Sequence, residues 1–86
     1  MKPRKLLERL QNGAYQNVAF DDFVALIEVF GFYETRSRGS HRLFAHPICE
    51  EELNLQPKHG EAKPYQIRQF LNLVEGYNLS MREDQQ

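Results

Sequence analysis

The stretch of residues 20–46 constrains the fold most, because its hydrophobic period changes abruptly at a glycine. Before that glycine, bulky apolar side chains recur at the spacing of one helix face: Phe23, Leu26, Ile27 and Phe30. Gly31 suits the left-handed residue that follows a helix, and Phe32 suits the hydrophobic contact that accompanies such an end. Strand-forming residues and a turn signal at Gly39 come next. The pattern predicts a helix over residues 20–30 that leads directly into a β-hairpin.

We expect the hairpin to have strands over residues 32–36 and 41–46, joined by a turn at residues 37–40. A short third strand over residues 53–56 is predicted to follow. It ends at Pro57, which has no N–H to donate to a sheet.

Two more helices are predicted, one on each side of this region. The first begins at Pro3 and ends at Asn12-Gly13, and the last begins near Pro64. The order of helix, helix, three antiparallel strands and helix predicts an α+β fold with helices on one face of the sheet. We expect an N-terminal helical extension over residues 1–19, a main domain over residues 20–79 and a polar tail over residues 80–86, which is frayed from Met81 onward.

Composition narrows the function classes. At 86 residues the chain holds one domain, and 41% hydrophobic residues suffice for one core. The only cysteine is Cys49, which excludes an internal disulfide and an all-cysteine zinc site. No apolar run approaches the roughly 20 residues of a membrane span, and no signal-peptide pattern opens the chain. We therefore expect a soluble, cytosolic protein without a membrane partner.

The net charge of -1 by itself argues against a nucleic-acid-binding protein, but the basic residues are clustered. Residues 1–19 hold four Lys or Arg against one Glu, and residues 32–46 hold three Arg against one Glu. A local basic stripe on a nearly neutral chain permits phosphate contact with weak non-specific affinity.

The second basic block contains the candidate catalytic residue, His41. It follows Ser40 directly, and three guanidinium groups flank it: Arg36, Arg38 and Arg42. A histidine with an ordinary pKa of about 6.5 can act as a general base at neutral pH, and guanidinium groups bind phosphate with two hydrogen bonds. A general base and a phosphate-binding group are the minimum needed to cleave RNA, because the 2′-hydroxyl of the RNA itself is the nucleophile. On spacing alone, a solvated arginine-rich strand edge without any chemistry explains the same residues.

The other two histidines offer weaker signals. His46 lies five residues from His41 on the same predicted strand, so the two side chains should lie on opposite faces and cannot share a metal ion. His59 either transfers a second proton, contacts a phosphate or caps the last helix. No group of Asp or Glu is spaced to complete a site with any histidine, so we expect no metal and no cofactor.

In chain order these pieces resemble HicA-type toxins, the YcfA-like mRNA interferases. The resemblance is carried by Gly31-Phe32 and by three motifs: Arg-x-Arg-Gly-Ser-His at residues 36–41, Phe-x-His-Pro at residues 44–47 and Pro-x-His-Gly at residues 57–60. It covers about residues 20–79. It implies a fold like that of double-stranded-RNA-binding domains, a three-stranded antiparallel sheet with helices on one face, to which this chain adds an N-terminal helix.

The resemblance also implies a function. Such toxins are metal-independent ribonucleases that cleave mRNA and arrest growth, and their catalytic histidine belongs to the Gly-Ser-His motif, here His41. A HicB-type antitoxin binds the toxin and masks its active site. On this interpretation, phosphate contacts are expected from Arg36, Arg38, Ser40, Arg42, His59 and Lys63. Lys63 lies near a predicted helix N-terminus, where anions are favoured.

Two other classes of function remain open from the sequence. One is a non-catalytic module on the same fold that binds RNA or only a protein partner, in keeping with the weak positive field. The other is a structural interaction domain that docks through the acidic loop at residues 50–52 and the first helix.

Overall fold

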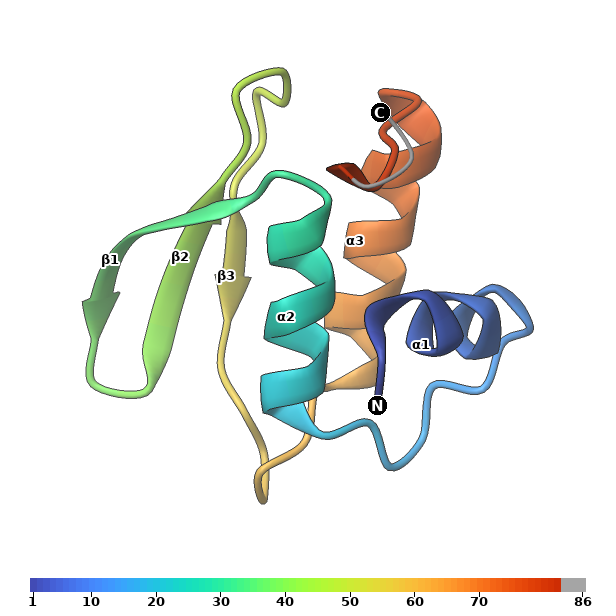
Figure 1. Ribbon diagram of the computed structural model, residues 1–86. Coiled ribbons are helices and arrows are strands. Elements are labelled where there is room, and N and C mark those ends of the chain that lie inside the picture. The colour runs from blue at the N-terminus through green and yellow to red at the C-terminus, as the bar shows by residue number, and fades with distance from the viewer. Residues whose placement is uncertain (83–86) are drawn as a thin grey trace.

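The computed structural model describes residues 1–82 and contains the predicted order of elements. Figure 1 shows α1 (Pro3–Gln11), α2 (Phe20–Val29), β1 (Tyr33–Arg38), β2 (His41–Ala45), β3 (Leu53–Leu55) and α3 (Pro64–Gly76). The strands form one antiparallel sheet in the order β1-β2-β3. The α+β fold class predicted from the periodicity is therefore confirmed.

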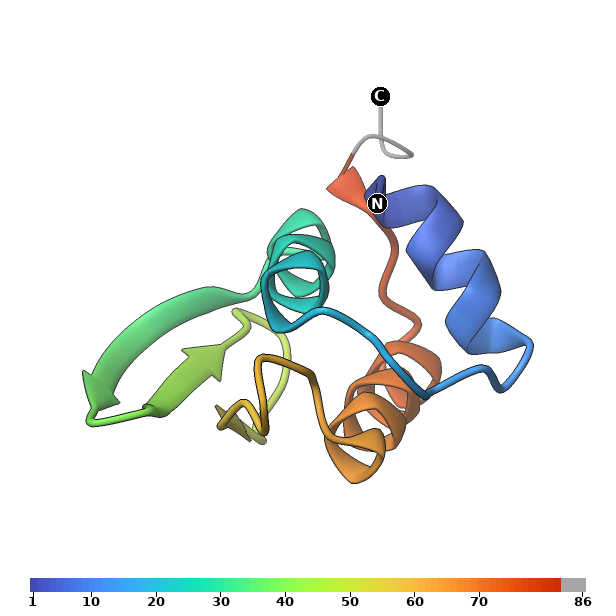
Figure 2. The ribbon, with the colours of Figure 1, turned by 90° about the horizontal axis from the view of Figure 1, so that it is seen from below.

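The elements form layers that leave one face of the sheet uncovered. Figure 1 and Figure 2 show α2 and α3 on one side of the sheet, and α1 on the side of this helix pair away from the sheet. Leu53 and Leu55 of β3 are fully buried, whereas Asn54 between them is exposed. Within residues 1–82 no helix or strand lies over the side of Asn54, which we call the open face. No helix in the same part of the chain is long and apolar enough to cross a membrane.

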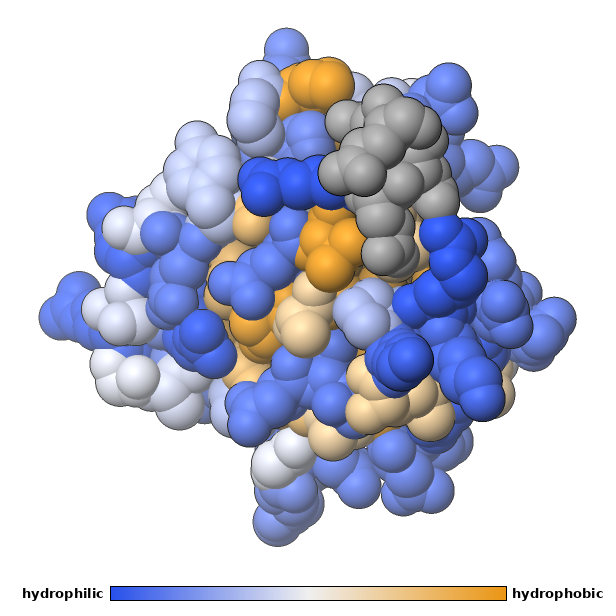
Figure 3. All heavy atoms as spheres, in the orientation of Figure 1, coloured by the Kyte–Doolittle hydropathy of each residue, from blue (hydrophilic) through white to orange (hydrophobic). Residues whose placement is uncertain are grey.

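The core lies between the sheet and the helices, around Phe70 of α3. Its ring meets the rings of Phe23, Phe30 and Phe32 edge-on, with centroids 5.7, 5.3 and 6.0 Å away. Aromatic pairs in this geometry contribute about 0.5–1.5 kcal/mol beyond the area that they bury. Figure 3 shows hydrophobic side chains gathered around α2 and mostly hydrophilic ones on the projecting hairpin. The apolar stripe predicted for α2 thus faces the core.

Segments on both sides of the main domain join this core. Leu6 and Leu10 of α1 are buried, and Met81 is only 1% exposed. The expectation of a frayed tail is therefore wrong at Met81, because its side chain packs into the core cluster. Residues 83–86 of the predicted tail lie outside the described residues.

α2 ends as the sequence predicts, at Gly31. The N–H of Gly31 donates to the carbonyl oxygen of Glu28 at 2.9 Å, and the N–H of Phe32 donates to that of Ile27 at 3.1 Å. These two bonds define a Schellman motif. Gly31 has a φ of 103°, and a Cβ atom there would lie 2.9 Å from Nε2 of His46. Glycine alone fits both conditions.

His46 connects the end of α2 to the segment that follows β2. Its Nε2–H donates to the carbonyl oxygen of Phe30 at 2.9 Å, and its Nδ1 accepts from the N–H of Ile48 at 3.1 Å. Its ring also meets the ring of Phe32 edge-on at 5.0 Å. These contacts occupy both ring nitrogens, which gives His46 a structural role.

The strands differ from their predicted form in several places. The turn of the hairpin consists only of Gly39-Ser40, because residues 37 and 38 still pair with β2. β3 ends one residue earlier than expected. A β-bulge interrupts the pairing between Glu34 and Arg36. A bulge adds one residue to its strand and so reverses the alternation of faces beyond it.

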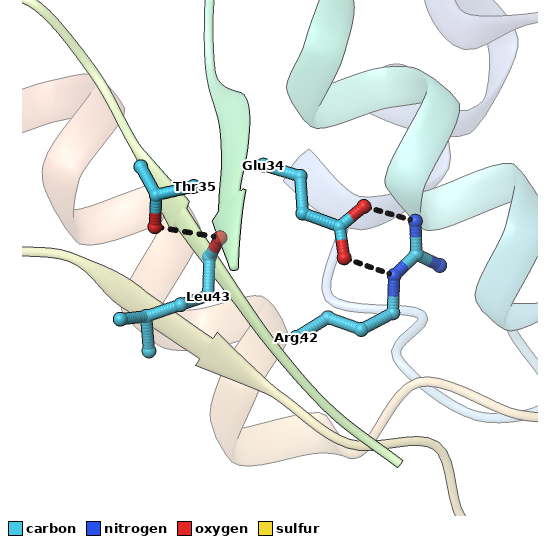
Figure 4. Close-up of polar contacts among 4 residues, drawn as sticks. All are labelled: Glu34, Thr35, Arg42 and Leu43. Atoms are coloured by element: carbon cyan, nitrogen blue, oxygen red, sulfur yellow. Dashed lines mark hydrogen bonds and ion pairs between the residues drawn. The ribbon is translucent and has the colours of Figure 1, made fainter. Parts of the chain in front are cut away.

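Glu34, before the bulge, lies on the face that the helices cover. Nε and Nη2 of Arg42 each donate to its carboxylate at 3.0 Å, as Figure 4 shows. The guanidinium group of Arg42 also lies over the rings of Phe44 and Phe20, 5.3 and 5.8 Å from their centroids. These hydrogen bonds lower the pKa of Glu34 and raise the pKa of Arg42. The pair therefore stabilises the fold above the ordinary pKa of a glutamate, and this contribution is lost as the pH falls through the lowered value.

Candidate functional site

A hollow of about 570 Å³ lies on the open face of the sheet. All three strands contribute to its lining, which consists of Arg36, Ser37, Arg38, His41, Leu43 and Asn54. Three of these are among the seven site residues that the sequence predicts. The hollow is therefore the candidate site, with His41 as its titratable group.

Cross-strand pairing brings these side chains together. Arg38 pairs with His41. Arg36 pairs with Leu43, which in turn pairs with Asn54 of β3. Directly paired residues point to the same face of a sheet, so the three strands present these five side chains side by side.

The bulge at Thr35 decides which arginines face the hollow. Without it, strand alternation would place Glu34 and Arg36 on the same face. With it, Glu34 points toward α2, and Arg36 and Arg38 point to the open face. The hydroxyl of Thr35 donates to the carbonyl oxygen of Leu43 at 3.3 Å and ties the bulge to β2, as Figure 4 shows.

His41 is exposed at the start of β2. Its Nδ1 lies 3.3 Å from Oδ1 of Asn54 on the neighbouring strand. Because an amide oxygen only accepts, Nδ1 carries the proton and donates it. Nε2 then keeps its lone pair, and no other group within residues 1–82 forms a hydrogen bond with it.

Arg36 and Arg38 form no ion pair within residues 1–82. Both lie on β1, all of whose residues are exposed. Their guanidinium groups are therefore free to bind an anion beside His41.

Arg42 does not belong to this group, which corrects the expectation that all three arginines act beside His41. It is adjacent to His41 in β2, so its side chain points to the opposite face. There it is held by the carboxylate of Glu34. Of the three predicted arginines, two therefore lie on the open face, and the third binds Glu34 on the covered face.

Ser40 and Lys63 are not among the residues that line the hollow. Ser40 lies in the hairpin turn, where its hydroxyl oxygen accepts from Nε2 of Gln56 at 2.9 Å. Lys63 is the N-cap residue of α3, and its Nζ lies over the ring of Tyr65, 6.0 Å from the centroid. Neither of these contacts directs a side chain into the hollow.

His59 lies in a tight turn beyond β3. The N–H and carbonyl groups of Lys58 and Glu61 bond to each other, and both central residues have positive φ, 53° at His59 and 75° at Gly60. These values fit a type I′ turn. Within residues 1–82, His59 forms no capping hydrogen bond with α3. Oε1 of Gln66 accepts the N–H of Lys63 at this end of the helix.

Three residues that shape the site were not predicted from the sequence: Asn54, Leu43 and Thr35. Asn54 had a detectable signal, since a polar residue between two leucines of a short strand points away from the core. Its contact with His41 depends on the register between strands, which carries no local signal. Within residues 1–82 no three His, Cys, Asp or Glu side chains lie close enough to hold a metal ion.

Comparison with known proteins identifies the family. The model of the HicA toxin of bacterial toxin–antitoxin systems matches residues 20–75, well over half of the chain. The matched stretch contains every residue that lines the hollow. No curated protein and no solved structure matches the chain. The chain therefore belongs to the HicA toxin family of bacterial toxin–antitoxin systems.

Proposed function

We propose that this toxin is a metal-independent endoribonuclease that cleaves mRNA, with His41 as its general base. One observation carries the proposal: His41 and two guanidinium groups without ion pairs within residues 1–82 face the same open hollow. The family supports the role of a toxin, and these residues supply a chemistry that suits it.

The proposed reaction uses a nucleophile that belongs to the substrate. Nε2 of His41 takes the proton of a ribose 2′-hydroxyl, and the 2′-oxygen forms a bond to the adjacent phosphorus. The bond from phosphorus to the 5′-oxygen breaks, and the 5′-oxygen takes a proton from water. The hydroxide that remains takes the proton from His41, which restores the base. Arg36 and Arg38 stabilise the negative charge that develops on the phosphate oxygens. Such a reaction leaves a 2′,3′-cyclic phosphate and needs no metal ion.

The open face also favours single-stranded RNA over a duplex. Tyr33 pairs with Ala45 on the same face and is 50% exposed, so its ring is available for a base to stack on it. Stacking of this kind accepts any base that is not already paired. We propose Ser40, His59 and Lys63 as outer contacts for an RNA strand that extends beyond the hollow.

Membership in a toxin–antitoxin family implies an antitoxin as partner. We propose that it is of the HicB type and that it covers the open face. This face is the one that no element covers within residues 1–82, and an occupant there would separate His41 from RNA.

The test of the function uses the purified protein with an mRNA in the presence of EDTA. We expect cleavage to continue with the chelator present and the fragments to end in 2′,3′-cyclic phosphates. The same RNA with 2′-O-methyl groups throughout should remain intact, because it lacks the nucleophile. Cleavage of the methylated RNA, or fragments that end in a 3′-hydroxyl, would contradict the proposed reaction.

Replacing Arg36 or Arg38 with alanine should weaken RNA binding by a similar factor for every sequence tested. Each loss should also reduce the slope of log affinity against log salt concentration by about 0.7, the value for one phosphate contact on a single strand. Titrations at several salt concentrations measure both effects.

Arg42→Gln is the matched control for these two variants, because it removes the same charge from the covered face. Its salt slope should equal that of the wild type. If Arg42→Gln reduced the salt slope equally, Arg42 would also contact the RNA, which would contradict its place on the covered face.

A further inference from the structure

We infer that Asn54 is a positioning residue for His41, which selects the ring tautomer and directs the basic nitrogen toward the hollow. The inference deepens the proposed function and rests on it for its catalytic meaning. The contact that carries it joins Nδ1 of His41 to Oδ1 of Asn54 at 3.3 Å.

The place of Asn54 is fixed by its neighbours on β3. Leu53 and Leu55 are both fully buried in the core, so the backbone between them is held from either side. Asn54 pairs with Leu43 of β2 and reaches across to His41, two residues along the same strand and on the same face. The amide on β3 and the imidazole on β2 are therefore both positioned by the pairing of adjacent strands.

The amide oxygen imposes one tautomer on the neutral ring. It can only accept, so the proton must lie on Nδ1 and the lone pair on Nε2. Free histidine in water favours the opposite tautomer, with the proton on Nε2. Without Asn54, the more populated tautomer would turn its lone pair toward β3 and leave an N–H facing the RNA.

An amide also differs from the carboxylate that could make the same contact. A carboxylate would hold the same tautomer, but its charge would favour the protonated imidazolium. A protonated ring cannot accept the 2′-hydroxyl proton. Asn54 therefore orients the ring without favouring its protonated form.

The first test measures the tautomer of the His41 ring directly and does not depend on catalytic activity. In the ¹⁵N-labelled protein, two-bond ¹H–¹⁵N correlation spectra should show the proton of neutral His41 on Nδ1. In Asn54→Ala, the proton should move largely to Nε2. Asn54→Asp should keep it on Nδ1. Asn72, exposed on α3, provides the control variants Asn72→Ala and Asn72→Asp, which should leave His41 unchanged.

Cleavage rates measured on the same variants complete the test. Asn54→Ala should lower kcat about tenfold with little change in KM, since orientation and not RNA binding is lost. Asn54→Asp should recover the rate at high pH, with the acid limb of its pH profile moved upward by about one unit. Asn72→Asp should show neither effect, which separates a local contact from a change in net charge.

Each outcome decides the inference. A proton on Nε2 in the wild type, or an unchanged tautomer and pH profile in Asn54→Ala, would overturn it. If the tautomer behaves as expected but the wild type cleaves no RNA, the proposed function fails while the orienting role of Asn54 stands.

Discussion

Replacing His41 with alanine is expected to lower RNA cleavage by about 10²–10⁴-fold, the contribution of a positioned general base. Induced expression of this variant should no longer arrest growth. His41 is exposed, so its removal leaves no buried cavity, and the variant should fold like the wild type. Initial rates on one RNA, growth curves and circular dichroism spectra measure the three quantities.

His46→Gln is the control for the loss of a histidine. His46 does not line the hollow, and glutamine keeps a donor and an acceptor for its two structural hydrogen bonds. We expect this variant to cleave RNA at close to the wild-type rate. Undiminished cleavage by His41→Ala would remove His41 from the mechanism. A folded wild type that binds RNA without cutting it would favour the non-catalytic binding module.

Replacing Phe70 with alanine is expected to lower the free energy of unfolding by about 3–5 kcal/mol, the cost of a large cavity in a packed core. Phe70 is fully buried and meets three other rings edge-on. Small domains have a total stability of only about 5–15 kcal/mol. A substantial fraction of this variant should therefore be unfolded at growth temperature. Chemical denaturation followed by circular dichroism measures the change.

Tyr65→Ala on the same helix is the matched control, because it removes a ring of similar size that is 54% exposed. Among the described residues, its only cation–π contact is with the ammonium group of Lys63. An exposed contact of this kind contributes about 0.5–1 kcal/mol. We expect a loss of about this size or less. Equal losses in the two variants would contradict the central position of Phe70 in the core.

The sequence predicts most of the secondary structure because the signals are local. Helical spacing in α2, the glycine that ends it and the proline that opens α3 each act within a few residues. α2, its end and the start of α3 all lie where the sequence places them. The predictions failed where long-range packing decides. Met81 follows a polar pattern in the sequence, yet it is buried because the surrounding helices offer it an apolar site.

The candidate site was predictable in part, for the same reason. His41 was identified by its neighbours in the chain, and the two arginines on the open face belong to the same short block. Arg42 was grouped with them, although strand alternation alone places it on the other face from His41. Asn54 was missed because its contact with His41 joins two strands and two residues that are 13 positions apart in the sequence.

By itself, the sequence determined the order of helices and strands, the end of α2 at Gly31 and the histidine at the centre of the candidate site. Only the tertiary structure decided that Arg36 and Arg38 stand beside that histidine and that Asn54 orients it. The physical reason is the period of a β-strand. The extra residue at Thr35 reverses the faces of all later residues of β1. This bulge is defined only by the pairing between β1 and β2.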